Sequence, residues 1–141
     1  MKTILSLYKH PKIEHIICVS HHDANVLTHG LNINKSRVST IYNCIETDLF
    51  SLPPAKINAI SYMPRKNPRD SQIVLSLIEN RTWKKPWTLR AIENCSLVDV
   101  SNYLKESLVF MSFGYPEGFG LPLAEALASG CAIIGYHGLG G

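Results

Sequence analysis

Two short apolar runs near the end of the chain constrain its fold most. The runs LVFMSF (108–113) and CAIIGY (131–136) are almost wholly apolar. Runs of this kind are typical of parallel β-strands that are covered on both faces. Between them, LPLAEALAS (121–129) has the composition of a helix, and Gly130 follows it as a stop. This order predicts two parallel strands joined by a crossover helix.

The same alternation runs through the rest of the chain. Further strands are predicted at 13–20, 37–45, 59–63 and 87–93, and further helices at 21–30, 67–81 and 96–107. Ser20 is the predicted N-cap of the first of these helices. Asn67 is the predicted N-cap of the second, with Pro68 at its first position and Asp70 in its first turn. The pattern predicts an α/β fold with a parallel sheet and flanking helices.

One segment interrupts the periodic pattern. Residues 46–58 contain Pro53 and Pro54 in succession, which makes them the best candidate for a linker. The chain therefore divides into a predicted N-terminal part before this segment and a second part after it.

Composition and charge limit the classes of protein and partner. Hydrophobic residues make up 45% of the 141-residue chain and charged residues 18%, which is a globular composition. The formal net charge of +3 is too small to indicate nucleic acid binding. It is compatible with a small anionic ligand held by a few cations.

The cysteines and the apolar segments bear on location. Cys18, Cys44, Cys95 and Cys131 are widely spaced and form no C-x-x-C pair, so we expect buried free thiols in a reducing compartment. No run reaches the roughly 18 apolar residues of a membrane span, and the start of the chain has no signal-like core. A cytoplasmic protein is the expectation.

The stretch YPEGFGLPLAEALASG (115–130) combines a flexible turn, a helix start and two acids. In an open parallel sheet, ligands bind beyond the carboxyl ends of the strands. Gly118 and Gly120 would let a ligand approach the main chain, and a helix start that contains Pro122 would offer its amides to a phosphate. Glu125 would then hold a ribose and Glu117 a second sugar, which describes a nucleotide-diphosphate sugar. The residues alone leave an alternative to this ligand site open. In that alternative the Gly-x-Gly turn is a common structural turn and Glu125 is a solvated helix residue.

A family resemblance bears on that choice. Glu117 and Glu125, with seven residues between them, resemble the E-x7-E signature of family 4 (group 1) retaining glycosyltransferases, and EGFGLPLAEALASG is similar to that family's EGFGLPxxEAMAxG. IICVSHHDANVL, VSTIYNCIETDLF and AISYMPRK resemble further family segments in the right order, so the likeness covers nearly the whole chain.

The resemblance implies a partial GT-B fold, which has two Rossmann-like domains facing each other across a cleft. Residues 1–50 would be the end of the acceptor-side domain with the crossover, and 51–141 a partial nucleotide-sugar-binding domain. Glu117 would be catalytic, contacting the hydroxyls of the donor sugar, and Glu125 would bind the ribose. The backbone at four residues would meet the sugar and diphosphate: Gly118, Phe119, Gly120 and Leu121.

Cations are expected to neutralise the departing diphosphate. By resemblance these are Arg65 and Lys66, although the sequence here departs from the family's GRLxxxKG. On residue type alone, a solvated loop between Pro64 and Pro68 is the alternative. The chain has no Asp-x-Asp pair for a divalent ion, and neither a metal nor a cofactor is expected.

The resemblance implies transfer of a sugar, with retention, from a nucleotide-diphosphate sugar to a carbohydrate or glycolipid acceptor in polysaccharide or glycoconjugate biosynthesis. It leaves room for peripheral membrane association of the full-length enzyme. Relative to the family the chain is truncated at both ends, so we expect it to be inactive alone. Two alternatives stay open: a non-catalytic nucleotide-sugar-binding fragment, and a sugar-nucleotide epimerase of the same fold.

Other polar and aromatic groups favour structural interpretations. His21, His22 and Asp23 are adjacent residues that face different directions on a helix, so a helix start is favoured over a metal site. Trp83 and Trp87 flank two lysines and a proline. Packed aromatics in an exposed loop are favoured there over stacking on a base.

Overall fold

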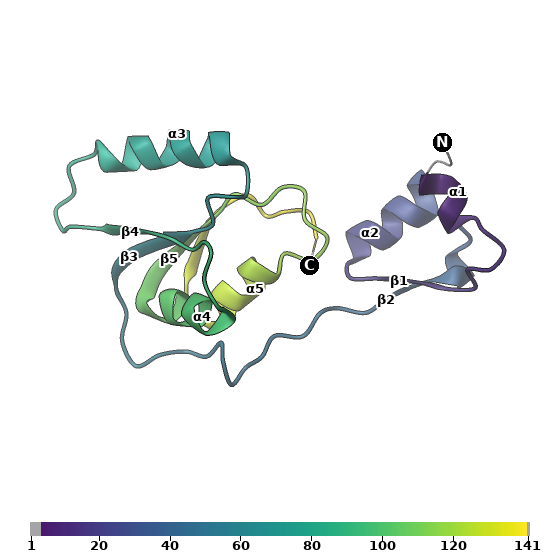
Figure 1. Cartoon of the computed structure of the whole chain (residues 1–141), viewed down its shortest axis with the longest axis horizontal. Coiled ribbons are helices and arrows are strands. Elements are labelled where there is room, and N and C mark those ends of the chain that lie inside the picture. The colour runs from purple at the N-terminus through teal and green to yellow at the C-terminus, as the bar shows by residue number, and fades with distance from the viewer. Residues whose placement is uncertain (1–3, 141) are drawn as a thin grey trace. The chain divides into compact units, whose positions relative to one another are not determined.

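The computed structural model describes residues 4–140, which form two compact units (Figure 1). Among the described residues, unit 1 comprises the chain up to Asn43 together with 116–119 and the segment from Gly138. Unit 2 comprises Cys44–Tyr115 and Gly120–His137. The interpretation of residues 1–50 as the end of an acceptor-side domain stays a prediction.

Unit 1 is built on one pair of parallel strands. Its elements are α1 (Ile4–Tyr8), β1 (Ile16–Cys18), α2 (His21–Asn25), a π-helical turn (Val26–Gly30), a 3-10 turn (Lys35–Arg37) and β2 (Val38–Thr40). The side chain of Ser20 accepts a hydrogen bond from the amide of Asp23, which confirms the predicted N-cap. Cys18, Leu27 and Ile33 form a small core. The short helix α1 was not predicted.

Unit 2 contains a four-stranded parallel sheet in the order β4-β3-β5-β6. Its elements are β3 (Ile57–Tyr62), α3 (Pro68–Glu79), β4 (Thr88–Ala91), α4 (Leu97–Glu106), β5 (Ser107–Ser112), α5 (Leu121–Ala128) and β6 (Ala132–Gly135). Each corresponds to a predicted strand or helix, with boundaries that shift by a few residues. The predicted α/β fold with a Rossmann-like parallel sheet and flanking helices is confirmed.

Helices cover both faces of the sheet (Figure 1). On one face, Ile60 and Met111 of the central strands pack with Val74 and Ile78 of α3. A second cluster on the other face draws residues from β5, α4 and α5. It consists of Phe50, Met63, Ile92, Leu104, Phe110, Ala126 and Cys131. This three-layer packing explains why the central strands read as nearly continuous apolar runs.

Two predictions about burial were wrong. β6 was expected to be covered on both faces, but it is an edge strand, and Ile134 is 55% exposed. Four buried thiols were also expected. All four cysteines are free, and Cys18 and Cys131 are buried, whereas Cys44 and Cys95 are exposed because both lie in loops outside the strands.

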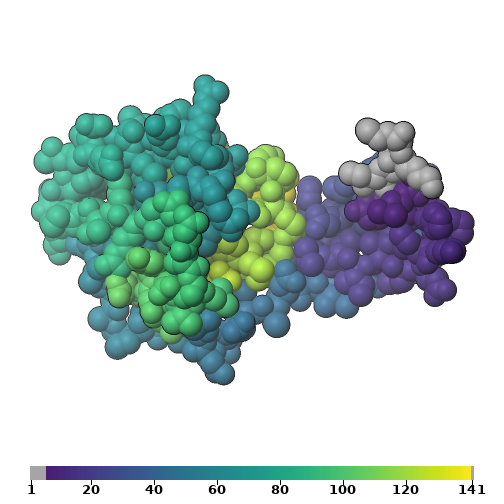
Figure 2. Space-filling model, viewed as in Figure 1, coloured from purple at the N-terminus to yellow at the C-terminus, as the bar shows by residue number. Residues whose placement is uncertain are grey.

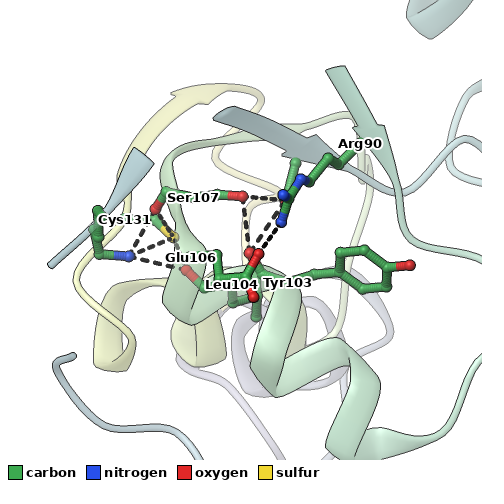
Figure 3. A network of polar contacts seen from close by, with 8 residues as sticks. Arg90, Tyr103, Leu104, Glu106, Ser107 and Cys131 are labelled. Atoms are coloured by element: carbon green, nitrogen blue, oxygen red, sulfur yellow. Dashed lines mark hydrogen bonds and ion pairs between the residues drawn. The ribbon is translucent and has the colours of Figure 1, made fainter. Parts of the chain in front are cut away.

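A lysine ties together the amino ends of three strands. Lys56 directly precedes β3, and its ammonium group donates hydrogen bonds to the carbonyls of Leu104 (2.9 Å) and Ser107 (2.7 Å), where α4 ends and β5 begins. The thiol of Cys131, just before β6, donates to the same two carbonyls (Figure 3). Burial raises the pKa of the Cys131 thiol, and the nearby Lys56 ammonium partly opposes that rise.

A second group in Figure 3 anchors the same helix end to β4. Arg90 of β4 pairs with the carboxylate of Glu106, and its guanidinium lies 6.0 Å from the centre of the Tyr103 ring. The hydroxyl of Ser107 donates to the carbonyl of Tyr103 at 2.8 Å. Exposed ion pairs contribute little, so we attribute most of the local stability to the buried hydrogen bonds.

Replacing Lys56 by Met should destabilise the chain by about 1–3 kcal/mol, because two helix-end carbonyls lose a charged donor. Lys84→Met, at an exposed lysine, is the matched control and should change the free energy of unfolding by less than about 0.5 kcal/mol. Urea denaturation measures both. Equal midpoints for the two variants would show that Lys56 does not hold the strand ends.

Candidate functional site

The carboxyl edge of the sheet in unit 2 brings three loops and one helix start together. β3, β5 and β6 run parallel and end at Tyr62, Ser112 and Gly135, so the segments that follow them lie at the same edge. α5 begins at Leu121, after the loop that leaves β5. This edge is where ligands bind in open parallel sheets.

Asn67 clips two of these loops together. Its backbone is left-handed (φ 46°), and its side-chain amide donates to the carbonyls of Phe113 (2.5 Å) and Tyr115 (3.5 Å). Asn67 occupies the N-cap position of α3 as predicted, but its side chain makes no cap hydrogen bond. The predicted capping role was wrong because the side chain is engaged by the loop after β5.

A tyrosine clips the third loop to the start of α3. The hydroxyl of Tyr136 donates to the carboxylate of Asp70 at 2.7 Å, which raises the pKa of Tyr136. The Tyr136 amide also donates to the carbonyl of Ser112 at 2.9 Å. Tyr115 and Tyr136 lie with their ring centres 5.8 Å apart, and both are exposed. The edge is therefore shaped by cross-links between loops and presents aromatic groups to solvent.

Glycine is required at the end of β6. Gly135 has a φ of +123°, and a Cβ there would lie 2.1 Å from the carbonyl oxygen of Ser112. No side chain fits so close to the neighbouring strand. The backbone of β6 thereby approaches β5 closely just before Tyr136.

The start of α5 leaves one amide without a partner. Gly120 is left-handed (φ 84°), and its carbonyl accepts hydrogen bonds from the amides of Leu123 (2.9 Å) and Ala124 (3.3 Å). Pro122, the second helical residue, has no N–H. Among residues 4–140 the amide of Leu121 has no hydrogen-bond acceptor. An amide in this place, at the positive end of a helix dipole, favours an anion.

Glu125 lies one turn into α5 and is half-buried. Burial raises the pKa of its carboxyl group, and the negative charge of Glu46 raises it further. Its side chain makes no hydrogen bond or ion pair with the described residues. A carboxylate in this state is free to accept hydrogen bonds from a ligand's hydroxyl groups.

The two predicted cations lie on the loop after β3. Arg65 is exposed and Lys66 is half-buried, in a turn closed by a hydrogen bond from the Lys66 amide to the carbonyl of Met63 (3.2 Å). Because β3 and β5 are parallel neighbours, this loop shares the carboxyl edge with the segment that leads to α5. The loop of Arg65 and Lys66 and the start of α5 thus lie at the same edge of the sheet of unit 2.

The other predicted site residues belong to unit 1. The amide of Glu117 donates to the carbonyl of Gly138 at 2.8 Å. A Cβ at Gly118 would lie 3.3 Å from the carboxylate of Asp23, so the loop packs closely on the start of α2. The ring of Phe119 lies 6.2 Å from that of Tyr42. The structure therefore assigns Glu117, Gly118 and Phe119 to one unit and Gly120, Leu121 and Glu125 to the other.

Sequence reasoning missed the residues that shape the edge. Tyr115 and Tyr136 each follow the carboxyl end of a buried or edge strand, which is the signal that could have found them. No sequence signal indicated that the Asn67 side chain bonds to the loop after β5, since an Asn before a Pro in a helical pattern is typical of a cap. Among residues 4–140, no group of three His, Cys, Asp or Glu side chains could hold a metal ion.

Comparison with known proteins gives a partial match. No protein-family model matches the chain. Over 47 residues it is 38% identical to an alpha-1,6-glucosyltransferase of Actinobacillus pleuropneumoniae serotype 7 (strain AP76). The match covers 33% of this chain and 14% of that protein. The chain is thus similar to a short part of that glucosyltransferase, and the match does not extend to the rest of that protein. No helix within residues 4–140 is long and apolar enough to cross a membrane.

Glu125→Gln should stabilise the chain at neutral pH. The raised pKa means that burial opposes the charged form of Glu125. The stability that this carboxyl group contributes is therefore present in full below its unfolded pKa, about 4.3, and is lost as pH rises through the folded value. We expect this substitution to add a few tenths to about 1 kcal/mol at pH 7, allowing for solvent screening, and almost nothing at pH 4.

Urea denaturation at pH 4 and pH 7 measures this difference, with Glu93→Gln at an exposed glutamate as the control. A Glu125→Gln variant that is less stable than the wild type at pH 7 would mean that the carboxylate has a stabilising partner.

Proposed function

We propose that this chain is the donor-binding part of a glycosyltransferase that takes its sugar from a nucleotide-diphosphate sugar. The observation that carries the proposal is the carboxyl edge of unit 2, where the unpartnered Leu121 amide at the start of α5 lies one turn before the half-buried carboxyl group of Glu125. An anion-binding amide followed by a hydroxyl-binding carboxylate suits a diphosphate joined to a ribose.

In this proposal the diphosphate binds at the start of α5. The amide of Leu121 donates to a phosphate oxygen, and Gly120 lets the phosphate approach the main chain because it has no side chain. Arg65 and Lys66, on the neighbouring loop after β3, add positive charge. Glu125 accepts hydrogen bonds from the two ribose hydroxyls. These hydrogen bonds replace those that the carboxylate makes with water before the ligand binds.

The chemistry requires stabilisation of the leaving group. When the bond between the sugar and the diphosphate breaks, the departing nucleoside diphosphate gains negative charge, and preorganised donors lower the barrier where that charge develops. Two cations and a helix start supply such donors. Glu117 would hold the hydroxyls of the transferred sugar, a role that rests on the E-x7-E spacing alone.

Retention of configuration, family 4 membership and a polysaccharide or glycolipid acceptor belong to the same proposal. They are supported by the resemblance of EGFGLPLAEALASG to the family motif. A complete reaction needs donor and acceptor held together, so the proposal also requires a binding site for the acceptor. The relative's name makes a glucosyl donor the first to test.

Isothermal titration of the chain with UDP-, GDP- and dTDP-hexoses tests the proposal. We expect one nucleotide class to bind, and we expect Glu125→Gln and the double variant Arg65→Met/Lys66→Met each to weaken binding about tenfold or more, since hydrogen bonds to charged groups contribute about 1.5–3 kcal/mol.

Lys84→Met is the matched control, because Lys84 follows α3 at the opposite edge of the sheet, and it should bind like the wild type. The stability of Glu125→Gln at pH 7 separates lost binding from lost folding. Absence of binding to all three nucleotide classes would contradict the proposal, as would binding that neither substitution changes.

A further inference from the structure

A hollow of about 380 Å³ lies in unit 2, away from the proposed donor site. It is lined by Ile78, Glu79, Trp83, Trp87 and Leu89. Its volume falls in the range of small-molecule sites, about 300–1,000 Å³. Four of the five lining residues have aliphatic or aromatic side chains, and the fifth is Glu79, so apolar and polar groups both face the open space.

The hollow lies at the amino edge of the sheet. α3 ends at Glu79 and β4 begins at Thr88, so the connecting loop lies where the strands start, whereas α5 begins at the edge where they end. In Figure 1 this loop joins the left end of α3 to β4, at the far side of unit 2 from the start of α5. The teal atoms at the left of Figure 2 belong to this part of the chain. A ligand here is separate from a donor at the carboxyl edge.

Internal contacts fix the aromatic wall. The indole N–H of Trp83 donates to the carbonyl of Ile78 at 3.2 Å, and the guanidinium of Arg81 lies 5.3 Å from the centre of the Trp83 ring. The two indole rings are tilted by 60° with their centres 6.3 Å apart. Trp87 packs on the apolar cluster of Ile60, Met111 and Phe113. Trp83 is nevertheless 42% exposed, so a fixed aromatic surface is presented to solvent.

We propose that this hollow binds a neutral saccharide, with a sugar ring packed on the Trp83–Trp87 wall and its hydroxyls donating to the Glu79 carboxylate. A pyranose ring has an apolar face of C–H groups and a rim of hydroxyls. The C–H face matches indole rings, which bury large apolar area at little cost in conformational entropy. The hydroxyls need an acceptor, and an exposed carboxylate supplies two oxygen atoms.

Charge selects against the other occupants. Glu79 is the charged residue among those that line the hollow, so an anionic ligand would lie against its carboxylate, and a lipid acyl chain would bury that carboxylate in hydrocarbon. Three nearby cations, Arg81, Lys84 and Lys85, do not line the hollow. They would attract an anionic lipid surface to the loop, and this alternative becomes an outcome of the test.

Such a site would hold a glycan at a distance from the reacting bond. A growing glycan or a glycan acceptor that is bound at the amino edge of unit 2 stays close to the enzyme between transfers. The effective concentration of that glycan rises without a new catalytic contact. The binding site itself does not rest on donor binding at α5, so the two proposals can fail separately.

The experiment uses tryptophan fluorescence, because the two tryptophans of the chain both line the hollow. Fluorescence emission is recorded while the chain is titrated with neutral hexasaccharides of glucose, galactose and mannose, including α-1,4- and α-1,6-linked glucose. We expect a saturable blue shift with at least one of them, as a sugar ring displaces water from Trp83.

Trp83→Ala should weaken that saccharide at least tenfold, followed by the remaining Trp87 emission and by calorimetry, and Glu79→Gln should weaken it severalfold. The double variant Lys84→Ala/Lys85→Ala should bind as the wild type does. Donor binding by Trp83→Ala should stay unchanged, which also reports that the variant is folded.

Three results would overturn the proposal. One is no spectral change with any of the hexasaccharides. Another is saccharide binding that Trp83→Ala and Glu79→Gln leave intact. The third is a blue shift with phosphatidylglycerol vesicles, abolished in Lys84→Ala/Lys85→Ala, without a response to saccharides; that result would assign the loop to a lipid surface.

Discussion

The ammonium group of Lys56 ties the amino end of β3 to the end of α4 and the start of β5. It bonds to the carbonyls that end α4 and begin β5, next to the buried Cys131 that precedes β6. Parallel strands have no tight turns between them, so contacts of this kind and the covering helices position their ends. With the amino ends fixed, the carboxyl ends of β3, β5 and β6 meet at one edge, where Asn67 and Tyr136 cross-link the loops.

Much of the fold could be predicted from the sequence, because its strongest signals are local. The runs at 108–113 and 131–136 specify strands through hydrophobic burial, and the cap residue Ser20 specifies a helix start through a satisfied helix amide. Burial of each strand face could not be predicted in the same way. Ile134 reads like a core residue, yet it lies on an edge strand, and strand order is a property of distant segments.

The candidate site was predictable where sequence neighbours form it. The turn at Gly120 and the acid one helical turn later, Glu125, lie within a few residues of each other, so their spacing predicts their geometry. The clips that shape the edge join residues far apart in sequence, Asn67 to Phe113 and Tyr136 to Asp70. Nothing local distinguishes those side chains from an ordinary cap or a surface tyrosine. The role of Glu117 remains a prediction of the motif.

The central claim is that the carboxyl edge of unit 2 binds a sugar nucleotide through the start of α5. A ¹⁵N–¹H correlation spectrum of the chain, recorded during titration with the preferred nucleotide sugar, tests it most directly. We predict that the largest saturable shifts fall on the amides of Gly120 and Leu121 and on the loop of Arg65 and Lys66. Shifts confined to other parts of the chain, with these amides unmoved at saturation, would contradict it.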